Sequence, residues 1–244
     1  MRFNFKATLI ASVAVMAATS ALAQKAGDQI VSVGLASINP DAQLGPVTTT
    51  STSQASATAF TNNLKDASAN VHSKTTVSFS WLYMYTDNIG AEVTLGIPPE
   101  FTQDLNTPNG SAPTFHGAAA KMKIHTPTAI AKYFFGTSQD KLRPYVGLGV
   151  SHVSFHNVEV NQSDDTVHKL AGTSASFSSS WAPVYNAGLI YHIDDKWSIS
   201  GSVAYLPIKT TATFVGPGLG VPVTSTGDVK LNTTDYVIRL GYRF

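Results

Sequence analysis

The pair of side chains most suggestive of chemistry is a histidine and a serine two residues apart, His152 and Ser154. In a strand, such neighbours project from the same face, so the imidazole is placed to act as a base toward the hydroxyl. Nucleophilic catalysis also needs an acid that orients the histidine, and the nearest candidate, Glu159, falls in or near a loop. Serine is abundant in the chain, so this spacing arises easily by chance, and we expect no enzyme.

Metal-ligating side chains are also present, because the chain has seven histidines, although it has no cysteine. His152 and His156 are four residues apart, which is about 13 Å in an extended strand and too far for one metal ion. The segment Asn161–Asp165 has side chains that could contact a cation, but it is better explained as a solvated loop. We expect no metal site and no cofactor. The formal net charge of +1 gives no basis for nucleic-acid binding.

The elements that would carry these side chains are strands, because apolar and polar residues alternate with a period of two. The clearest case is Thr234–Phe244, where apolar and aromatic residues at even positions alternate with a more polar set. The register of 144–157 is ambiguous, because Tyr145 favours one face and Val146 and Leu148 favour the other. We predict strands at residues 28–38, 77–85, 89–97, 121–135, 144–157, 180–193, 197–205 and 234–244.

The connections between these strands alternate in length. Three are short, at Asp87-Asn88, Gly136–Lys141 and Asp194–Lys196. Four are long, at Asn39–Asn70, Pro98–Gly117, Val158–Ser179 and Val215–Gly227. Strands of about ten residues with this alternation predict an all-β protein, an eight-stranded antiparallel transmembrane β-barrel with three short periplasmic turns and four long external loops. The charged fraction of 13% suits strands that face lipid, whereas a secreted β-sandwich or lipocalin-like barrel, the alternative, would have less regular loops.

Residues 1–23 have the pattern of a secretory signal peptide. Arg2 and Lys6 precede the apolar run Ala7–Ala18, which is too short to span a bilayer, and Ala21-Leu22-Ala23 ends the segment. We expect cleavage before Gln24. The mature chain, residues 24–244, is then exported, and the barrel pattern predicts the outer membrane of a Gram-negative bacterium.

Several segments resemble the outer membrane protein W (OmpW) family. They are Thr86–Val93, Pro127-Thr128 with Lys132–Phe135, Arg143–Gly149, Tyr191–Trp197 and Gly241–Phe244. The resemblance implies an eight-stranded barrel with a narrow, rather hydrophobic lumen that passes small hydrophobic compounds, with release sideways into the membrane. It also implies that the terminal aromatic residues Tyr242 and Phe244 are a signal for the outer-membrane assembly machinery. The Ser/Thr-rich stretch Thr48–Thr61 and the Gly/Pro-rich stretch Gly216–Val223 depart from the family pattern.

The predicted faces place two sets of side chains in the lumen. The apolar set is Leu82, Met84, Ile130 and Phe134, and the charged set is Glu92, Lys132, Arg239 and Arg243. One hypothesis is that the apolar set lines a binding path while the charges form a plug toward the periplasmic end. The alternative is that all of them pack the interior, because an eight-stranded barrel is only wide enough for side chains or one small ligand.

The function predicted is therefore a narrow path for small hydrophobic molecules. The alternatives are a non-conducting structural or receptor barrel, whose loops contact phage, bacteriocin or host, and a lipid A-modifying hydrolase built on His152 and Ser154. The expected partners are membrane lipid, lipopolysaccharide, the assembly machinery and the small hydrophobic molecules. We expect the stretch Ala42–Asn62 in the first long connection to be mobile and poorly ordered.

Overall fold

The computed structural model describes residues 24–64, 67–107, 115–164, 172–218 and 221–244. The predicted signal peptide, residues 1–23, lies outside these ranges. Within them, no helix combines the length and apolarity needed to cross a membrane.

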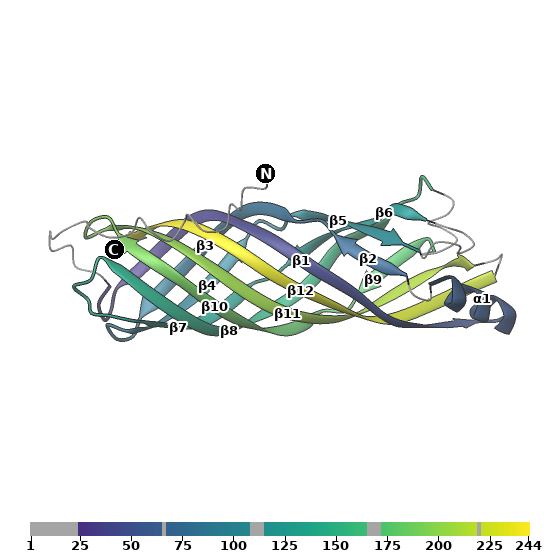
Figure 1. Ribbon diagram of the computed structural model, residues 1–244, viewed down its shortest axis with the longest axis horizontal. Coiled ribbons are helices and arrows are strands. Elements are labelled where there is room, and N and C mark those ends of the chain that lie inside the picture. The colour runs from purple at the N-terminus through teal and green to yellow at the C-terminus, as the bar shows by residue number, and fades with distance from the viewer. Residues whose placement is uncertain (1–23, 65–66, 108–114, 165–171, 219–220) are drawn as a thin grey trace, which may run out of the picture.

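Eight antiparallel strands close into a barrel (Figure 1). In order around the ring they neighbour one another as β10-β11-β12-β1-β3-β4-β7-β8, and pairing of β8 with β10 closes it. A closed ring leaves no unpaired sheet edge inside a bilayer, which confirms the predicted fold class. The strands are β1 (Gln29–Ser51), β3 (Lys74–Met84), β4 (Ile89–Gly96), β7 (Thr128–Phe134), β8 (Leu142–Val160), β10 (Ser180–His192), β11 (Trp197–Gly218) and β12 (Val221–Arg243).

The strands run well beyond the predicted boundaries at the end of the barrel opposite the C-terminus (Figure 1). The prediction of a poorly ordered Ala42–Asn62 is wrong: β1 continues to Ser51, and helix α1 (Gln54–Leu64) follows. The Ser/Thr-rich part of β1 pairs with β12 from Val47 opposite Gly227 to Ser51 opposite Val223. These threonines have the β-branched side chains that favour strands, and the ladder satisfies their backbone.

The predicted strand 121–135 is two strands, β6 (His116–His125) and β7, which pair with different parts of β8. The break falls at Thr126-Pro127, where proline has no N–H to donate to a ladder. Three further strands, β2 (Ser68–Val71), β5 (Glu100–Asn106) and β9 (Ser174–Phe177), lie in segments predicted as loops. They extend the wall, as β2 pairs with β5, β5 with β6, and β9 with β11.

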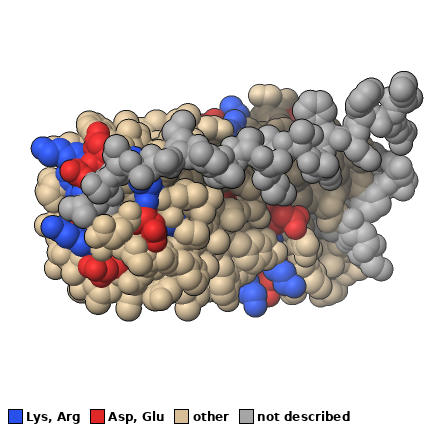
Figure 2. Space-filling view, turned by 60° about the vertical axis from the view of Figure 1, so that its left-hand side comes forward, with Lys and Arg blue, Asp and Glu red and all other residues tan. Residues whose placement is uncertain are grey.

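The outer surface of the ring is apolar. Trp181 is 71% exposed and Ile238 is 54% exposed, as expected for side chains that face lipid. Figure 2 shows mostly uncharged residues on one face, with the largest group of charged side chains at its left, over the turn end. The ambiguous strand is resolved, because Tyr145 is buried in the lumen while Val146, Leu148 and Val150 are exposed. Alternation therefore sorts the residues to lipid or lumen along each strand.

Candidate functional site

The turn end of the lumen is closed by packed apolar side chains, which we call the closing cluster. Its members are Ile30, Leu82, Met84, Phe134, Tyr145 and Ile190. Met84 is fully buried, and the rings of Phe134 and Tyr145 lie 5.2 Å apart. Three of the four apolar side chains predicted to line a path are therefore packed together at one end. Ile130 lies elsewhere, further from the turn.

A three-residue ion network lies next to the closing cluster. Lys132 Nζ is 2.8 Å from Glu92 Oε1, and Arg239 Nη1 is 3.6 Å from the same oxygen. Arg239 also donates to Ser78 Oγ at 2.9 Å, and Lys132 lies 4.4 Å from the centre of the Tyr145 ring. All three charged side chains are at most 7% exposed. Because isolated buried charges are costly, such a network holds only if its members stay together.

The order of these groups along the lumen can be followed on β7. Phe134 belongs to the closing cluster, Lys132 to the ion network, and Ile130 lines the space beyond it. Moving away from the Gly136 turn, the lumen is therefore first apolar and packed, then charged, then open. This order differs from the hypothesis, in which the charged set lies toward the periplasmic end and the apolar set lines the path.

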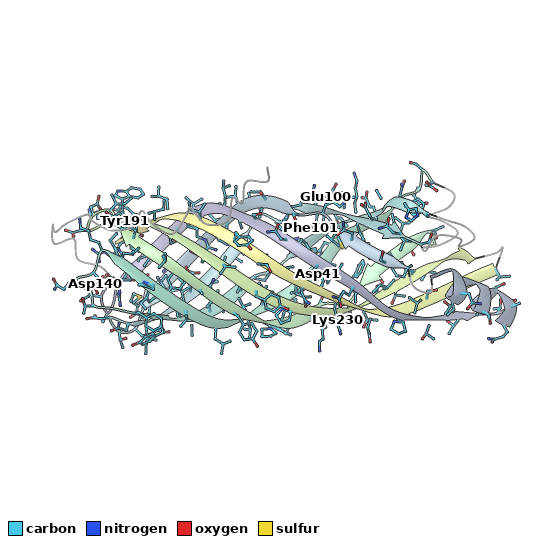
Figure 3. All side chains as sticks on the ribbon, viewed as in Figure 1. Asp41, Glu100, Phe101, Asp140, Tyr191 and Lys230 are labelled. Atoms are coloured by element: carbon cyan, nitrogen blue, oxygen red, sulfur yellow. The ribbon has the colours of Figure 1, made fainter. Side chains whose placement is uncertain are left out.

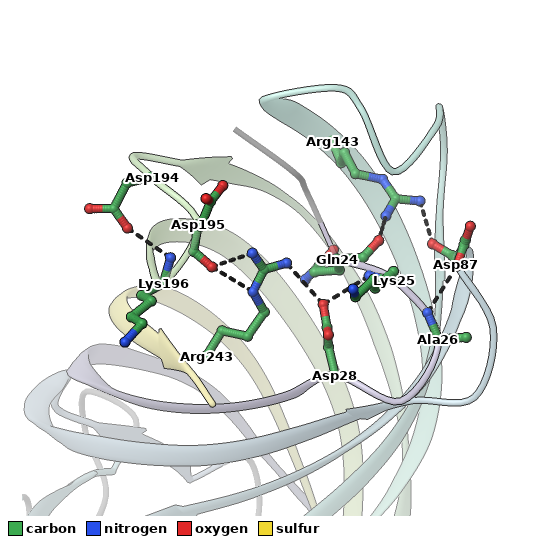
Figure 4. A network of polar contacts seen from close by, with 10 residues as sticks. All are labelled: Gln24, Lys25, Ala26, Asp28, Asp87, Arg143, Asp194, Asp195, Lys196 and Arg243. Atoms are coloured by element: carbon green, nitrogen blue, oxygen red, sulfur yellow. Dashed lines mark hydrogen bonds and ion pairs between the residues drawn. The ribbon is translucent and has the colours of Figure 1, made fainter. Parts of the chain in front are cut away.

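Arg243 does not sit with Glu92 but belongs to a second network at the rim of the turn end (Figure 4). Its Nη1 is 2.9 Å from Asp28 Oδ2, and the guanidinium also donates to the Asp195 carbonyl. Nearby, buried Arg143 donates to the carbonyls of Asp87 at 2.7 Å and Gln24 at 3.1 Å. These two arginines tie the turns to the segment that leads into β1.

Above the ion network, the lumen contains three neighbouring spaces that share lining residues. The first, the polar chamber, has about 640 Å³ of empty space, part of it open to solvent. Its lining includes Glu92, Ile130, Asn186, Asp235 and Arg239, with several threonines and serines. The polar chamber is thus where a molecule entering from the far end would meet hydrogen-bonding groups.

The second space, the neck, lies between the polar chamber and the extended part of the wall. It shares Ile38, Thr126 and Asp235 with the polar chamber, and its remaining lining is mainly apolar, with Phe101 and Ile124. The third space, the outer cavity, has about 810 Å³ of empty space, partly open to solvent, and shares Leu231 with the neck. Its walls are almost wholly apolar and include Val71, Leu105, Met122, Phe155, Phe177 and Phe214.

The outer cavity is the part of the site that sequence reasoning missed. Eight of its seventeen lining residues come from segments predicted as loops, including those that form β2, β5 and β9, and only Met122 and Phe155 fall in predicted strands. Asp235 and Arg239 both lie at odd positions of the last predicted strand, the more polar set, but the pattern predicts no role for Asp235. The alternation of Met122 and Ile124 with Lys121 and Lys123 was the available signal, and the prediction joined it to the residues that follow as one strand, 121–135.

The structure shows no hydrogen bond between His152 and Ser154, the candidate catalytic pair. The His152 ring lies 4.9 Å from that of Trp181, whereas Ser154 Oγ lies 3.1 Å from His156 Nε2. The backbone of Glu159 pairs with that of Lys121 on the neighbouring strand. Within the described ranges, no three His, Cys, Asp or Glu side chains gather closely enough to hold a metal ion.

The terminal aromatic residues lie at the rim of the turn end. Tyr242 packs edge-on against Trp197 with ring centres 5.0 Å apart, and Phe244 is 68% exposed. The Phe244 N–H donates to the carbonyl of Gln29 at 3.1 Å, so the last residue is still bonded to β1. Their role as an assembly signal stays a prediction.

Comparison with known proteins gives concordant results. The model of the OmpW family matches residues 25–244. Outer membrane protein W of Vibrio cholerae is 32% identical, with 96% of this chain and 98% of that protein aligned. Outer membrane protein AlkL of Ectopseudomonas oleovorans is 26% identical over 73% of this chain and 69% of its own. The crystal structure of the outer membrane protein OprG from Pseudomonas aeruginosa superposes with a TM-score of 0.75 at 27% identity, covering 91% of this chain and 98% of OprG.

Proposed function

Because this chain belongs to the OmpW family of outer-membrane proteins in Gram-negative bacteria, we propose that it provides a narrow, largely hydrophobic path for small hydrophobic molecules. The observation that carries the proposal is the outer cavity, which is apolar, partly open to solvent and shares the wall residue Leu231 with the neck. Water finds few hydrogen-bonding partners on such walls, whereas an apolar molecule lowers its free energy when it moves from water into the cavity.

The way out of the outer cavity runs sideways rather than straight through the barrel. The ion network and the closing cluster obstruct the lumen toward the turn end. In the wall, β1 pairs with β3 only as far as Ile38 opposite Lys74, and β2 pairs with β5. Within the described ranges, no ladder joins β2 to the outer part of β1. This seam supports release of an apolar molecule through the wall toward lipid.

A non-conducting structural or receptor barrel is the second candidate. It is favoured by the same obstruction, because the closing cluster and ion network leave the turn end packed with side chains. In that case the extended rim, with α1 beside β1, would contact phage, bacteriocin or host surfaces. The uptake experiment below separates the two candidates.

The partners of the barrel follow from its surfaces. Lys209 and Lys230 lie directly opposite each other on β11 and β12, and both are exposed on the outer face (Figure 3 labels Lys230). Facing like charges are unfavourable unless an anion lies between them. Lys209 is four residues beyond Tyr205, about 10 Å higher for a strand tilted by about 40°. That height suits the phosphates of lipopolysaccharide.

We further propose that Tyr242 and Phe244 are recognised by the assembly machinery and that residues 1–23 are a cleaved signal peptide.

The proposed path is tested by filling the outer cavity. Ala120 is buried and lines the outer cavity, so Ala120→Phe should obstruct it. Ala118 lies on the same strand and is exposed, which makes Ala118→Phe the matched control. Initial uptake of radiolabelled decane is measured in cells that express each variant and lack their own OmpW-family proteins. We expect Ala120→Phe to fall toward the level of cells without the protein while the control matches the wild type. Uptake by the wild type no faster than by empty cells would favour the receptor barrel.

A further inference from the structure

Two hydrogen-bond acceptors face the polar chamber at the same level of the barrel. Asn186 on β10 pairs with Ala204 on β11, and Ala204 pairs with Asp235 on β12. Directly paired residues project from the same face of a sheet, and all three line the polar chamber. The two acceptors are two strands apart, which is about 9.5 Å between backbones. The small side chain between them leaves room for a ligand atom.

Each of the two side chains has one buried oxygen without a hydrogen-bond partner among the described residues, while the Asp235 carboxyl also accepts a hydrogen bond from the Thr233 side chain. The Asn186 Nδ2 donates to the Val203 carbonyl at 3.0 Å, which fixes the amide and leaves its Oδ1 turned away from that bond. The Asn186 Oδ1 and the Asp235 Oδ1 are both shielded from solvent, and neither has a hydrogen-bond partner in the described part of the chain. Buried acceptors are nearly always paired, so two at one level of a cavity call for an explanation.

The charged groups nearby do not supply the missing donors. Arg239 lines the polar chamber but is engaged by Glu92 and Ser78, and Lys132 is engaged by Glu92. Asp235 therefore faces the cavity without an ion pair in the described ranges. Its position also matters, because it lines both the neck and the polar chamber. A molecule advancing from the outer cavity through the neck meets this carboxyl where apolar walls give way to polar ones.

We propose that Asp235 and Asn186 bind the hydrogen-bond-donating head, a hydroxyl or an amine, of an amphipathic molecule whose apolar chain occupies the neck and outer cavity. The inference rests on the proposed function and narrows its substrates. A ligand without a donor leaves both acceptors unpaired, whereas an alcohol or amine satisfies at least one of them. Sites with buried hydrogen-bonding groups discriminate strongly against analogues that lack the matching group.

The test compares decanol with decyl methyl ether, which has the same apolar chain but no donor. Binding of each radiolabelled compound is measured on the full chain in lipid nanodiscs, with protein-free nanodiscs as the background. The variants are Asp235→Leu, Asn186→Leu and the near-isosteric Asp235→Asn, and Thr234→Val on the outward side of β12 is the matched control. Heat-modifiable gel migration verifies that each variant is folded, and Asp235→Asn and Asn186→Leu keep the test valid if Asp235→Leu does not fold.

We expect the wild type and Thr234→Val to bind decanol about tenfold more tightly than the ether, the effect of one hydrogen bond. The preference should fall to near one in Asp235→Leu and decrease in Asn186→Leu, while ether binding is retained. Equal binding of the two compounds by the wild type, or an unchanged preference in both leucine variants, would overturn the inference alone. Absence of binding of either compound above protein-free nanodiscs would overturn the proposed function as well.

Discussion

Replacing Glu92 by glutamine tests whether the ion network holds the barrel interior together. The carboxylate is shared by Lys132 at 2.8 Å and Arg239 at 3.6 Å, so the three side chains carry a net charge of +1. Glu92→Gln keeps the shape of the side chain but leaves two cations in a site where each is at most 7% exposed. Removing one partner of a buried ion pair costs about 3–5 kcal/mol.

The expected loss lies near the lower end of that range. Arg239 keeps its hydrogen bond to Ser78, and Lys132 keeps the face of the Tyr145 ring at 4.4 Å, a cation–π contact that also contributes. We therefore expect Glu92→Gln to lower the free energy of unfolding by about 3 kcal/mol. Glu92→Gln with Lys132→Met restores the net charge of +1 and should recover most of this loss, which a double-mutant cycle would measure.

The assay is urea unfolding of the refolded protein in lipid vesicles, followed by tryptophan fluorescence and by heat-modifiable gel migration. The matched control is Glu100→Gln, because Glu100 pairs with Lys121 at 3.6 Å while both side chains are more than half exposed. Exposed pairs contribute about 0–1 kcal/mol, so the control should be nearly neutral. If the two glutamine variants lose the same small amount of unfolding free energy, the ion network does not hold the barrel interior together.

Three further predictions concern the turns and the closure of the barrel. Arg143→Met removes the donors to the carbonyls of Asp87 and Gln24 and should lower the free energy of unfolding by about 1–3 kcal/mol. Amide exchange should become faster in the 86–88 and 136–141 turns, and unchanged exchange would show that Arg143 does not hold these turns in place. Gly34→Ala places a Cβ 2.6 Å from the Arg239 Cα and should block the pairing of β1 with β12, so that the heat-shifted band is lost on the gel. The control Gly201→Ala should fold normally, because its Cβ meets nothing within 4 Å. Backbone N–H groups of Trp197 and Lys196 donate to Asp194 and lower its pKa below the ordinary value of 3.8. The Asp194 contribution to stability is therefore present above pH 3.8 and lost as the pH falls through the lower folded pKa, and a carboxyl NMR titration with a midpoint at 3.8 would contradict this.

The sequence was sufficient to predict the membrane-facing part of the barrel. There, each residue faces either lipid or lumen, so alternation records the side on which it lies, as exposed Ile238 and buried Arg239 show. The burial of Leu82, Met84, Phe134 and Glu92 followed from the same pattern.

Beyond the lipid-facing belt, the same reasoning failed for a physical reason. Outside the bilayer, the outward face of a strand may be polar or apolar, so threonine-rich stretches such as the end of β1 carry no alternation to read. Proline at 127 divides β6 from β7, yet apolar residues continue on both sides of it. The level shared by Asn186 and Asp235 depends on the register across three strands, which a single sequence does not encode locally.

Occupation of the outer cavity by apolar molecules can be measured by nuclear Overhauser contacts between protonated decane and the protein methyl groups in deuterated lipid nanodiscs. We expect saturable contacts to Met122 and Leu231 of the outer cavity, in addition to the contacts that decane dissolved in the lipid makes with outward-facing Leu148. Met84, buried in the closing cluster, should show none. If contacts are confined to outward methyl groups and Met122 and Leu231 show none at saturating decane, apolar molecules do not occupy the outer cavity.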